Sequence, residues 1–97
     1  MSSKGKGLAM HLDEAGSADV RRRLSRAEGQ LRGVIAMLDD GRECTDVLTQ
    51  LAAVTHALHR AGYAMLAGGL EQCLTAPADG AREENVDRLE KLFLALG

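Results

Sequence analysis

One stretch of the chain decides the fold: residues 44–73, which read CTDVLTQLAAVTHALHRAGYAMLAGGLEQC. Apolar residues recur in this stretch at steps of three and four, which is the pattern of a helix with one packing face. Its length exceeds that of most helices in globular proteins and is typical of the spine of a multimer. The two cysteines of the chain, Cys44 and Cys73, stand at its ends.

The spacing of the two cysteines predicts how they can meet. Position 73 follows position 44 by 29 residues, so both thiols lie on one side of the helix, about eight turns and about 43 Å apart. A disulfide requires Cα atoms within about 7 Å, so the two cannot pair within one chain while the helix is intact. In two helices packed antiparallel, Cys44 of one chain lies beside Cys73 of the other. The spacing therefore favours a dimer with two symmetric dithiol sites.

Two further helices are predicted from apolar repeats on either side of this stretch. Ser17 is the expected N-cap of the upstream helix and Gly41 its expected left-handed C-terminal cap. The downstream helix follows a break at Pro77 and Asp79-Gly80. The upstream seam comprises Val20, Leu24, Ala27, Leu31, Val34 and Leu38; the central seam Val47, Leu48, Leu51, Val54, Leu58, Ala61, Met65, Leu66 and Leu70; the downstream face Val86, Leu89, Leu92, Phe93 and Leu96.

Composition agrees with an all-α chain, because only 2% of the 97 residues are aromatic and helix formers such as Leu, Ala, Arg and Glu dominate. We expect a mobile tail, residues 1–16, and one helical domain, residues 17–97. So short a chain buries little apolar surface alone, so self-association is expected. No signal peptide or membrane span is recognisable, and two cysteines without an export signal favour reduced thiols in the cytoplasm.

Charge is segregated along the chain, although the net charge is only −2. Residues 17–33 carry five basic and two acidic residues, whereas residues 34–97 carry five basic and ten acidic ones. A cationic element on an otherwise anionic chain is typical of nucleic-acid contact, and a solvated arginine face on an ordinary helix would look the same. The five arginines are Arg21, Arg22, Arg23, Arg26 and Arg32.

Cys44 is the stronger candidate for a reactive thiol. A cysteine at a helix N-terminus lies at the positive end of the helix dipole, which favours the thiolate. Arg42 adds to this effect, while Glu43 and Asp46 oppose it. The alternative interpretations are a small buried hydrophobic residue and one ligand of a Cu(I) or Zn(II) site.

A metal site would need a third or fourth ligand besides the two thiolates. Gly69, one turn before Cys73, cannot coordinate. His56 and His59 lie in the middle of the stretch, with His59 about 21 Å from Cys73, so both are interpreted as surface or interface histidines. His11 could reach in from the tail. No metal site, catalytic arrangement or cofactor site is predicted, so no enzyme is expected.

Two segments resemble the copper-sensitive operon repressor (CsoR) family: residues 23–34, RLSRAEGQLRGV, and residues 44–54, CTDVLTQLAAV. The likeness covers about residues 20–96. It implies an all-α, three-helix protomer, an antiparallel dimer and a dimer-of-dimers tetramer. It also implies a bacterial cytoplasmic repressor that leaves its operator DNA when an inducer binds.

The resemblance also implies which residues contact DNA. Arg23 and Arg60 match the family's DNA-contact surface. To these we add four arginines that neighbour them and that the resemblance itself does not name. The fold contains no helix-turn-helix, so we expect readout through phosphates, groove shape and half-site spacing. The added neighbours are Arg21, Arg22, Arg26 and Arg32.

Branches of the family differ in their inducer. Copper sensors use a Cys, a His and a second Cys, and their His stands where this chain has Gly69. The nickel/cobalt branch has a His in place of Cys73 and uses an N-terminal His, for which His11 could stand in. The formaldehyde branch generally lacks the second cysteine. Two cysteines without the histidine are most similar to the persulfide-sensing branch, the CsoR-like sulfurtransferase repressors (CstR).

The persulfide branch implies a role for each thiol. Cys44 would attack reactive sulfur species, and Cys73 of the other chain would resolve the product into an interprotomer di-, tri- or higher sulfide. The crosslinked tetramer would fit DNA poorly. One alternative is a Cu(I) or other metal sensor of the same family, completed by His11 or an external thiol. Another, of a different class, is a thiol carrier or sulfurtransferase accessory protein that does not touch DNA.

Overall fold

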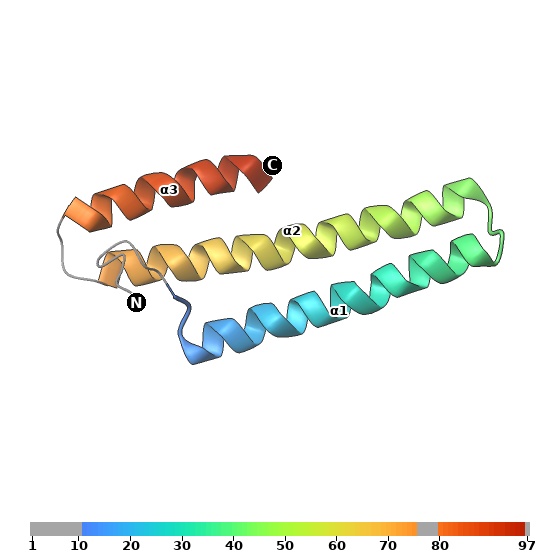
Figure 1. Ribbon diagram of the computed structural model, residues 1–97, viewed down its shortest axis with the longest axis horizontal. Coiled ribbons are helices and arrows are strands. Elements are labelled where there is room, and N and C mark those ends of the chain that lie inside the picture. The colour runs from blue at the N-terminus through green and yellow to red at the C-terminus, as the bar shows by residue number, and fades with distance from the viewer. Residues whose placement is uncertain (1–10, 76–79, 97) are drawn as a thin grey trace, which may run out of the picture.

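The computed structural model describes residues 11–75 and 80–96, which form three helices in an elongated arrangement (Figure 1). These are α1 (Glu14–Asp39), α2 (Cys44–Thr75) and α3 (Gly80–Leu96). α1 and α2 form an antiparallel hairpin, and α3 runs back along the second half of α2 on the side away from α1. The predicted all-α class with three helices is confirmed. Among the described residues, no helix is long and apolar enough to cross a membrane.

α1 begins earlier than predicted, because Asp13 and not Ser17 is its N-cap. Asp13 has an extended backbone, and its carboxylate accepts a hydrogen bond from the Gly16 N–H at 2.7 Å. Glu14 adds a second anion in the first turn, where the helix dipole favours negative charge. Residues 14–16, assigned to the tail from sequence, therefore belong to α1, while residues 1–10 lie outside the described part of the chain.

The turn between α1 and α2 is closed by Gly41, as predicted. Its φ is 69°, in the left-handed region. The Gly41 N–H donates to the Leu38 carbonyl at 3.1 Å, and the Arg42 N–H donates to the Met37 carbonyl at 3.0 Å. This pair of hydrogen bonds is the Schellman motif, which satisfies the last carbonyls of α1. The chain reverses within a few residues and α2 begins directly at Cys44.

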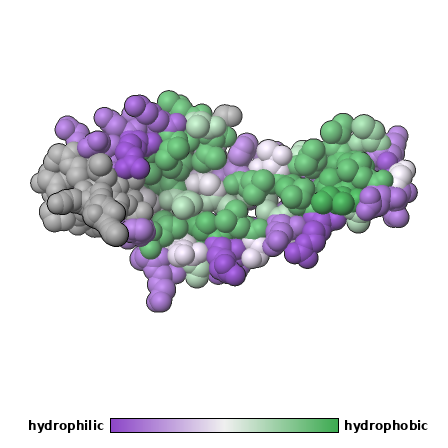
Figure 2. Space-filling model, in the orientation of Figure 1, coloured by the Kyte–Doolittle hydropathy of each residue, from purple (hydrophilic) through white to green (hydrophobic). Residues whose placement is uncertain are grey.

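Small residues fill the interface of the hairpin, and much of each predicted seam stays outside it. Val20, Ala27 and Val34 of α1 are buried, but the alternate seam positions Leu24, Leu31 and Leu38 remain exposed. Two helices bury one narrow stripe between them, and the valines and alanines occupy it. The buried residues of α2 are Val47, Val54, Ala57 and Ala61, whereas Leu48, Leu51, Leu58, Met65 and Leu70 are exposed. Figure 2 shows apolar side chains along the visible face of the hairpin.

Three glycines in the second half of α2 let other segments approach it closely. A Cβ at Gly62 would lie 2.9 Å from Leu96 Cδ1, and one at Gly69 would lie 3.3 Å from Leu89 Cδ2. A Cβ at Gly68 would collide with the Leu12 side chain. The glycines weaken an isolated helix by about 1 kcal/mol each. The closely packed neighbours that compensate for them are α3 and the segment before α1, in the same chain.

Replacing Gly41 by Ala should lower the free energy of unfolding by about 1 kcal/mol, because an L side chain is strained in the left-handed region. Gly41→Asn should cost less, since Asn tolerates this conformation. Urea unfolding followed by circular dichroism, at one protein concentration, measures both. Equal stability of Gly41→Ala and the wild type would contradict the role assigned to this turn.

Candidate functional site

Cys44 is the first residue of α2, and its thiol is exposed. The charged neighbours considered from sequence partly pair with each other, since Arg42 Nη2 lies 3.9 Å from Asp46 Oδ2. What distinguishes Cys44 is its place at the positive end of the helix dipole, open to solutes.

Cys73 belongs to the last turn of α2, and its side chain lies outside the described part of the structure. α2 is unbroken from Cys44 to Thr75, so the prediction that one long helix carries both cysteines is confirmed. Their Cα atoms are therefore separated by about 43 Å within one protomer. The end of α2 is tied to α3, because Arg82 Nη2 donates to the Leu74 carbonyl at 2.7 Å. Any site that uses both thiols needs a second chain.

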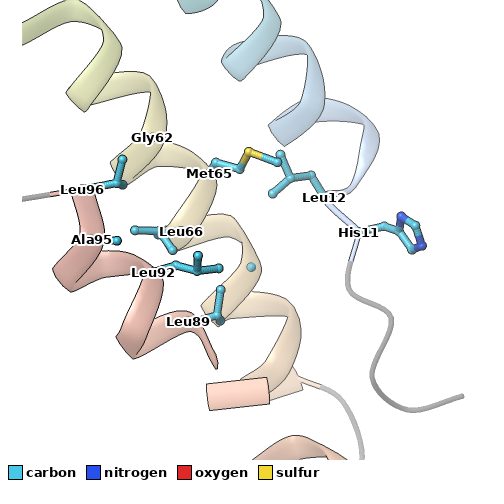
Figure 3. A pocket seen from close by; sticks show the side chains of 10 residues that line it. His11, Leu12, Gly62, Met65, Leu66, Leu89, Leu92, Ala95 and Leu96 are labelled. Carbon is cyan, nitrogen blue, oxygen red and sulfur yellow. The ribbon is translucent and has the colours of Figure 1, made fainter. Parts of the chain in front are cut away.

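Gly69, the position at which the resemblance places a histidine in copper sensors, is buried under α3. It lines an apolar cavity of about 420 Å³ between α2, α3 and residues 11–12 (Figure 3). Most of the lining is aliphatic, with Leu66, Leu89 and Leu92 at its centre. The imidazole of His11 points away from these side chains in Figure 3. Of the residues that line this cavity, His11 and Met65 carry a side chain with a metal-donor atom, whereas Gly69 supplies none.

The other histidines do not build a metal centre. His56 is exposed, and the half-buried His59 packs against Tyr63, with ring centroids 6.1 Å apart. Tyr63 in turn packs against Phe93 of α3 at 5.6 Å. Within the described residues, no group of three His, Cys, Asp or Glu side chains could hold a metal ion. His59 is a packing residue of the protomer.

The predicted DNA-contact arginines of α1 fall into two groups, and the first surrounds Asp19. Arg22 Nη2 donates to Asp19 Oδ1 at 2.8 Å, and Arg23 Nε donates to Asp19 Oδ2 at 3.0 Å. The hydrogen bond from Arg23, opposed in part by desolvation and reinforced by the charges of Arg23 and Arg22, holds the pKa of Asp19 below its ordinary value. Arg26 lies two turns further along, within about 20° of Asp19 around the helix.

The second group lies on the other side of α1. Arg21 and Arg32 are rotated by about 140–160° from Asp19, and Arg32 pairs with Glu28 at 3.4 Å. The structure thus brings Arg22, Arg23 and Arg26 to one side and leaves Arg21 and Arg32 away from them.

Arg60 stands on α2 and is exposed. Val34 packs in one cluster with Val47, so in the antiparallel hairpin Arg60 lies level with the first half of α1. Asp19, which pairs with two of the arginines of α1, was not singled out as their partner from sequence. Its spacing of three and four residues to Arg22 and Arg23 was the available signal, because side chains at these spacings are neighbours on a helix.

A family model described as a metal-sensitive transcriptional repressor matches residues 17–95. The copper-sensing transcriptional repressor RicR of Mycobacterium tuberculosis is 45% identical over 60 residues, covering 61% of this chain and 62% of the relative. The copper-sensing transcriptional repressor CsoR of Mycobacterium ulcerans is 43% identical over 68 residues, covering 69% and 58%. This chain thus spans about three fifths of the length of these curated relatives.

A solved structure, the nickel-responsive transcriptional regulator InrS, is similar with a TM-score of 0.68 and 36% identity, covering 82% of this chain and 91% of that one. These relatives are named for copper and nickel, so they lend no support to the assignment to the persulfide-sensing branch. They do confirm the family predicted from the two sequence segments, which is one of repressors and not of enzymes. The chain belongs to the metal-sensitive transcriptional repressor family, to which the CsoR proteins belong.

Proposed function

We propose that this protein is a DNA-binding transcriptional repressor. Its affinity for operator DNA would be controlled by an effector that acts at Cys44 and Cys73 of paired protomers. The family match over residues 17–95 carries the proposal. The side of α1 that carries Arg22, Arg23 and Arg26 supplies a positively charged surface for phosphates, on a chain whose remainder is anionic. We place the protein in the cytoplasm, where thiols stay reduced.

The proposed working unit is an antiparallel dimer, two copies of which form a tetramer. The exposed leucines of the hairpin support this assembly, because monomers rarely leave a long apolar surface uncovered. Leu24 and Leu31 are 45% and 43% exposed in the single protomer. Antiparallel pairing would cover these residues and bring Cys44 of each chain beside Cys73 of the other.

The first candidate effector is Cu(I), which the copper-sensing relatives support. Thiolates are the donors that favour this ion. The usual third ligand does not fit here, because Gly69 offers no donor and Leu89 stands 3.3 Å from the point a Cβ would occupy. A Cu(I) site in this protein would be held by one thiolate from each chain and completed by His11 or an external thiol.

The second candidate effector is a reactive sulfur species, which the same glycine favours. Sulfur transfer needs two thiols and no third ligand. The Cys44 thiolate would attack the outer sulfur of a persulfide and release its thiol. Cys73 of the other chain would then attack the Cys44 persulfide, forming an interprotomer disulfide and releasing hydrogen sulfide; longer polysulfides would leave extra sulfur in the link.

Operator release measured under anaerobic conditions separates the two candidates. If Cu(I) is the effector, stoichiometric Cu(I) releases the DNA. Cys44→Ser and Cys73→Ser should then each abolish both the binding of Cu(I) and the release of the DNA. If sulfur is the effector, polysulfide produces a chain-to-chain adduct whose mass differs from a plain disulfide by multiples of sulfur. His56→Ala serves as the control and should change neither response. Release that persists without both cysteines would contradict the proposed site.

Removing an arginine from the Asp19 side of α1 should weaken DNA binding more than removing one from the other side. We expect Arg26→Ala to lower affinity for the promoter of its own or a neighbouring operon. The slope of the logarithm of the binding constant against the logarithm of salt concentration should become less steep by about one. Arg32→Ala is the matched control, since Arg32 pairs with Glu28 and lies on the other side of α1. Fluorescence anisotropy at several salt concentrations measures both.

An absence of promoter binding by the wild-type protein at low salt would contradict the repressor proposal. That result would favour the alternative of a thiol carrier or sulfurtransferase accessory protein.

A further inference from the structure

Asp19 accepts hydrogen bonds from two of the arginines that the proposed function assigns to DNA. Each of its carboxylate oxygens receives one guanidinium, from Arg22 at 2.8 Å and from Arg23 at 3.0 Å. The side chains stay partly open to solvent, with Asp19 at 36% and Arg23 at 41% exposure. The group thus forms an accessible, ordered cluster on α1 and not a buried structural network.

The atoms used in these bonds decide what the arginines can still do. Arg23 donates through Nε, which leaves its two terminal nitrogens without a hydrogen bond to any residue in the described part of the chain. Those two nitrogens form the fork that contacts a phosphate through two parallel hydrogen bonds. A guanidinium held at Nε therefore has its outer edge turned away from the carboxylate that holds it.

We propose that Asp19 is a positioning residue for DNA binding, which orients the guanidinium of Arg23 toward a phosphate and holds that of Arg22 beside it. The inference rests on the proposed function as an operator-binding repressor. It gives the single carboxylate inside the cationic cluster a role that its charge alone would oppose, since a carboxylate repels phosphates.

These two effects of Asp19 act differently on specific and non-specific DNA. Non-specific binding depends on total charge, so the carboxylate weakens it. Operator binding requires phosphates to be met in a fixed register, so an arginine already held in place strengthens it. The hydrogen bonds from Arg23 and Arg22 keep the pKa of Asp19 below its ordinary value, so the carboxylate is ionised at neutral pH.

The test compares Asp19→Ala with Glu28→Ala on an operator duplex and on a scrambled duplex of equal length. Each variant removes one carboxylate that pairs with arginine on α1, two arginines for Asp19 and one for Glu28. Position 28 lies on the opposite side of the helix from position 19. We expect Asp19→Ala to lower operator affinity by about tenfold, within the range for residues sharing one ion-pair network. Its affinity for scrambled DNA should stay equal or rise, and Glu28→Ala should lower neither.

A double-mutant cycle with Arg23→Ala shows whether Asp19 acts through Arg23. In the Arg23→Ala background, removing Asp19 should lower operator affinity much less, because only the contact with Arg22 is then lost. Arg23→Lys keeps the charge but lacks Nε and the fork, so it should behave like Arg23→Ala on the operator. Circular dichroism and thermal unfolding of each variant show that the helices remain folded, and Asp19→Asn repeats the comparison with the least change of shape.

Equal increases in affinity for both duplexes after Asp19→Ala would overturn the inference, because Asp19 would then be only an unfavourable charge. The same holds if Asp19→Ala lowers operator affinity equally with and without Arg23. Failure of the proposed function looks different, because the wild type would then not bind the operator. If the wild type binds the operator and Arg23→Ala binds it equally well, the inference alone is overturned.

Discussion

The constraint on which the rest depends is the continuity of α2. A helix running without a break from Cys44 to Thr75 keeps its two cysteines about 43 Å apart, so chemistry that uses both thiols must join two chains. In the proposed dimer, an effector bound by both thiols would act on quaternary structure directly, because the proposed site would lie at the boundary between the two chains. The exposed thiol at the start of α2 and the uncovered leucines of the hairpin fit such an arrangement.

Packing also explains why position 69 contributes no ligand. Gly62 and Gly69 share one side of α2, two turns apart, and Leu96 and Leu89 of α3 sit against them. A side chain at position 69 would place its Cβ 3.3 Å from Leu89 Cδ2, so Leu89 would have to shift by a few tenths of an ångström. In this protein the position serves the contact between α2 and α3, and the site that we propose relies on the two thiols. This holds for either candidate, Cu(I) or reactive sulfur.

Apolar periodicity and capping residues were enough to predict the three helices. The features that depend on tertiary packing could not be predicted from the sequence. Gly41 was predictable because a left-handed cap after Asp39-Asp40 has few other candidates. The N-cap was not, since Asp13 and Ser17 both offer capping oxygens and the choice between them is made by the surrounding structure, where Leu12 packs at Gly68. Periodicity located the apolar seams but not which half of each seam faces the other helix of the hairpin. The arginines were visible as a charged segment, but their division into two sides needed the helix phase and the bonds to Asp19.

The most direct test of the account mixes two single variants, Cys44→Ser and Cys73→Ser, and treats the mixture and each variant alone with a short bifunctional thiol reagent. A mixed antiparallel pair retains one Cys73 and one Cys44 that face each other. We therefore predict a covalent dimer in the mixture, containing one chain of each kind, and none in either variant alone. Crosslinking within a single variant, or none in a mixture shown to exchange subunits, would contradict antiparallel pairing of the two thiols.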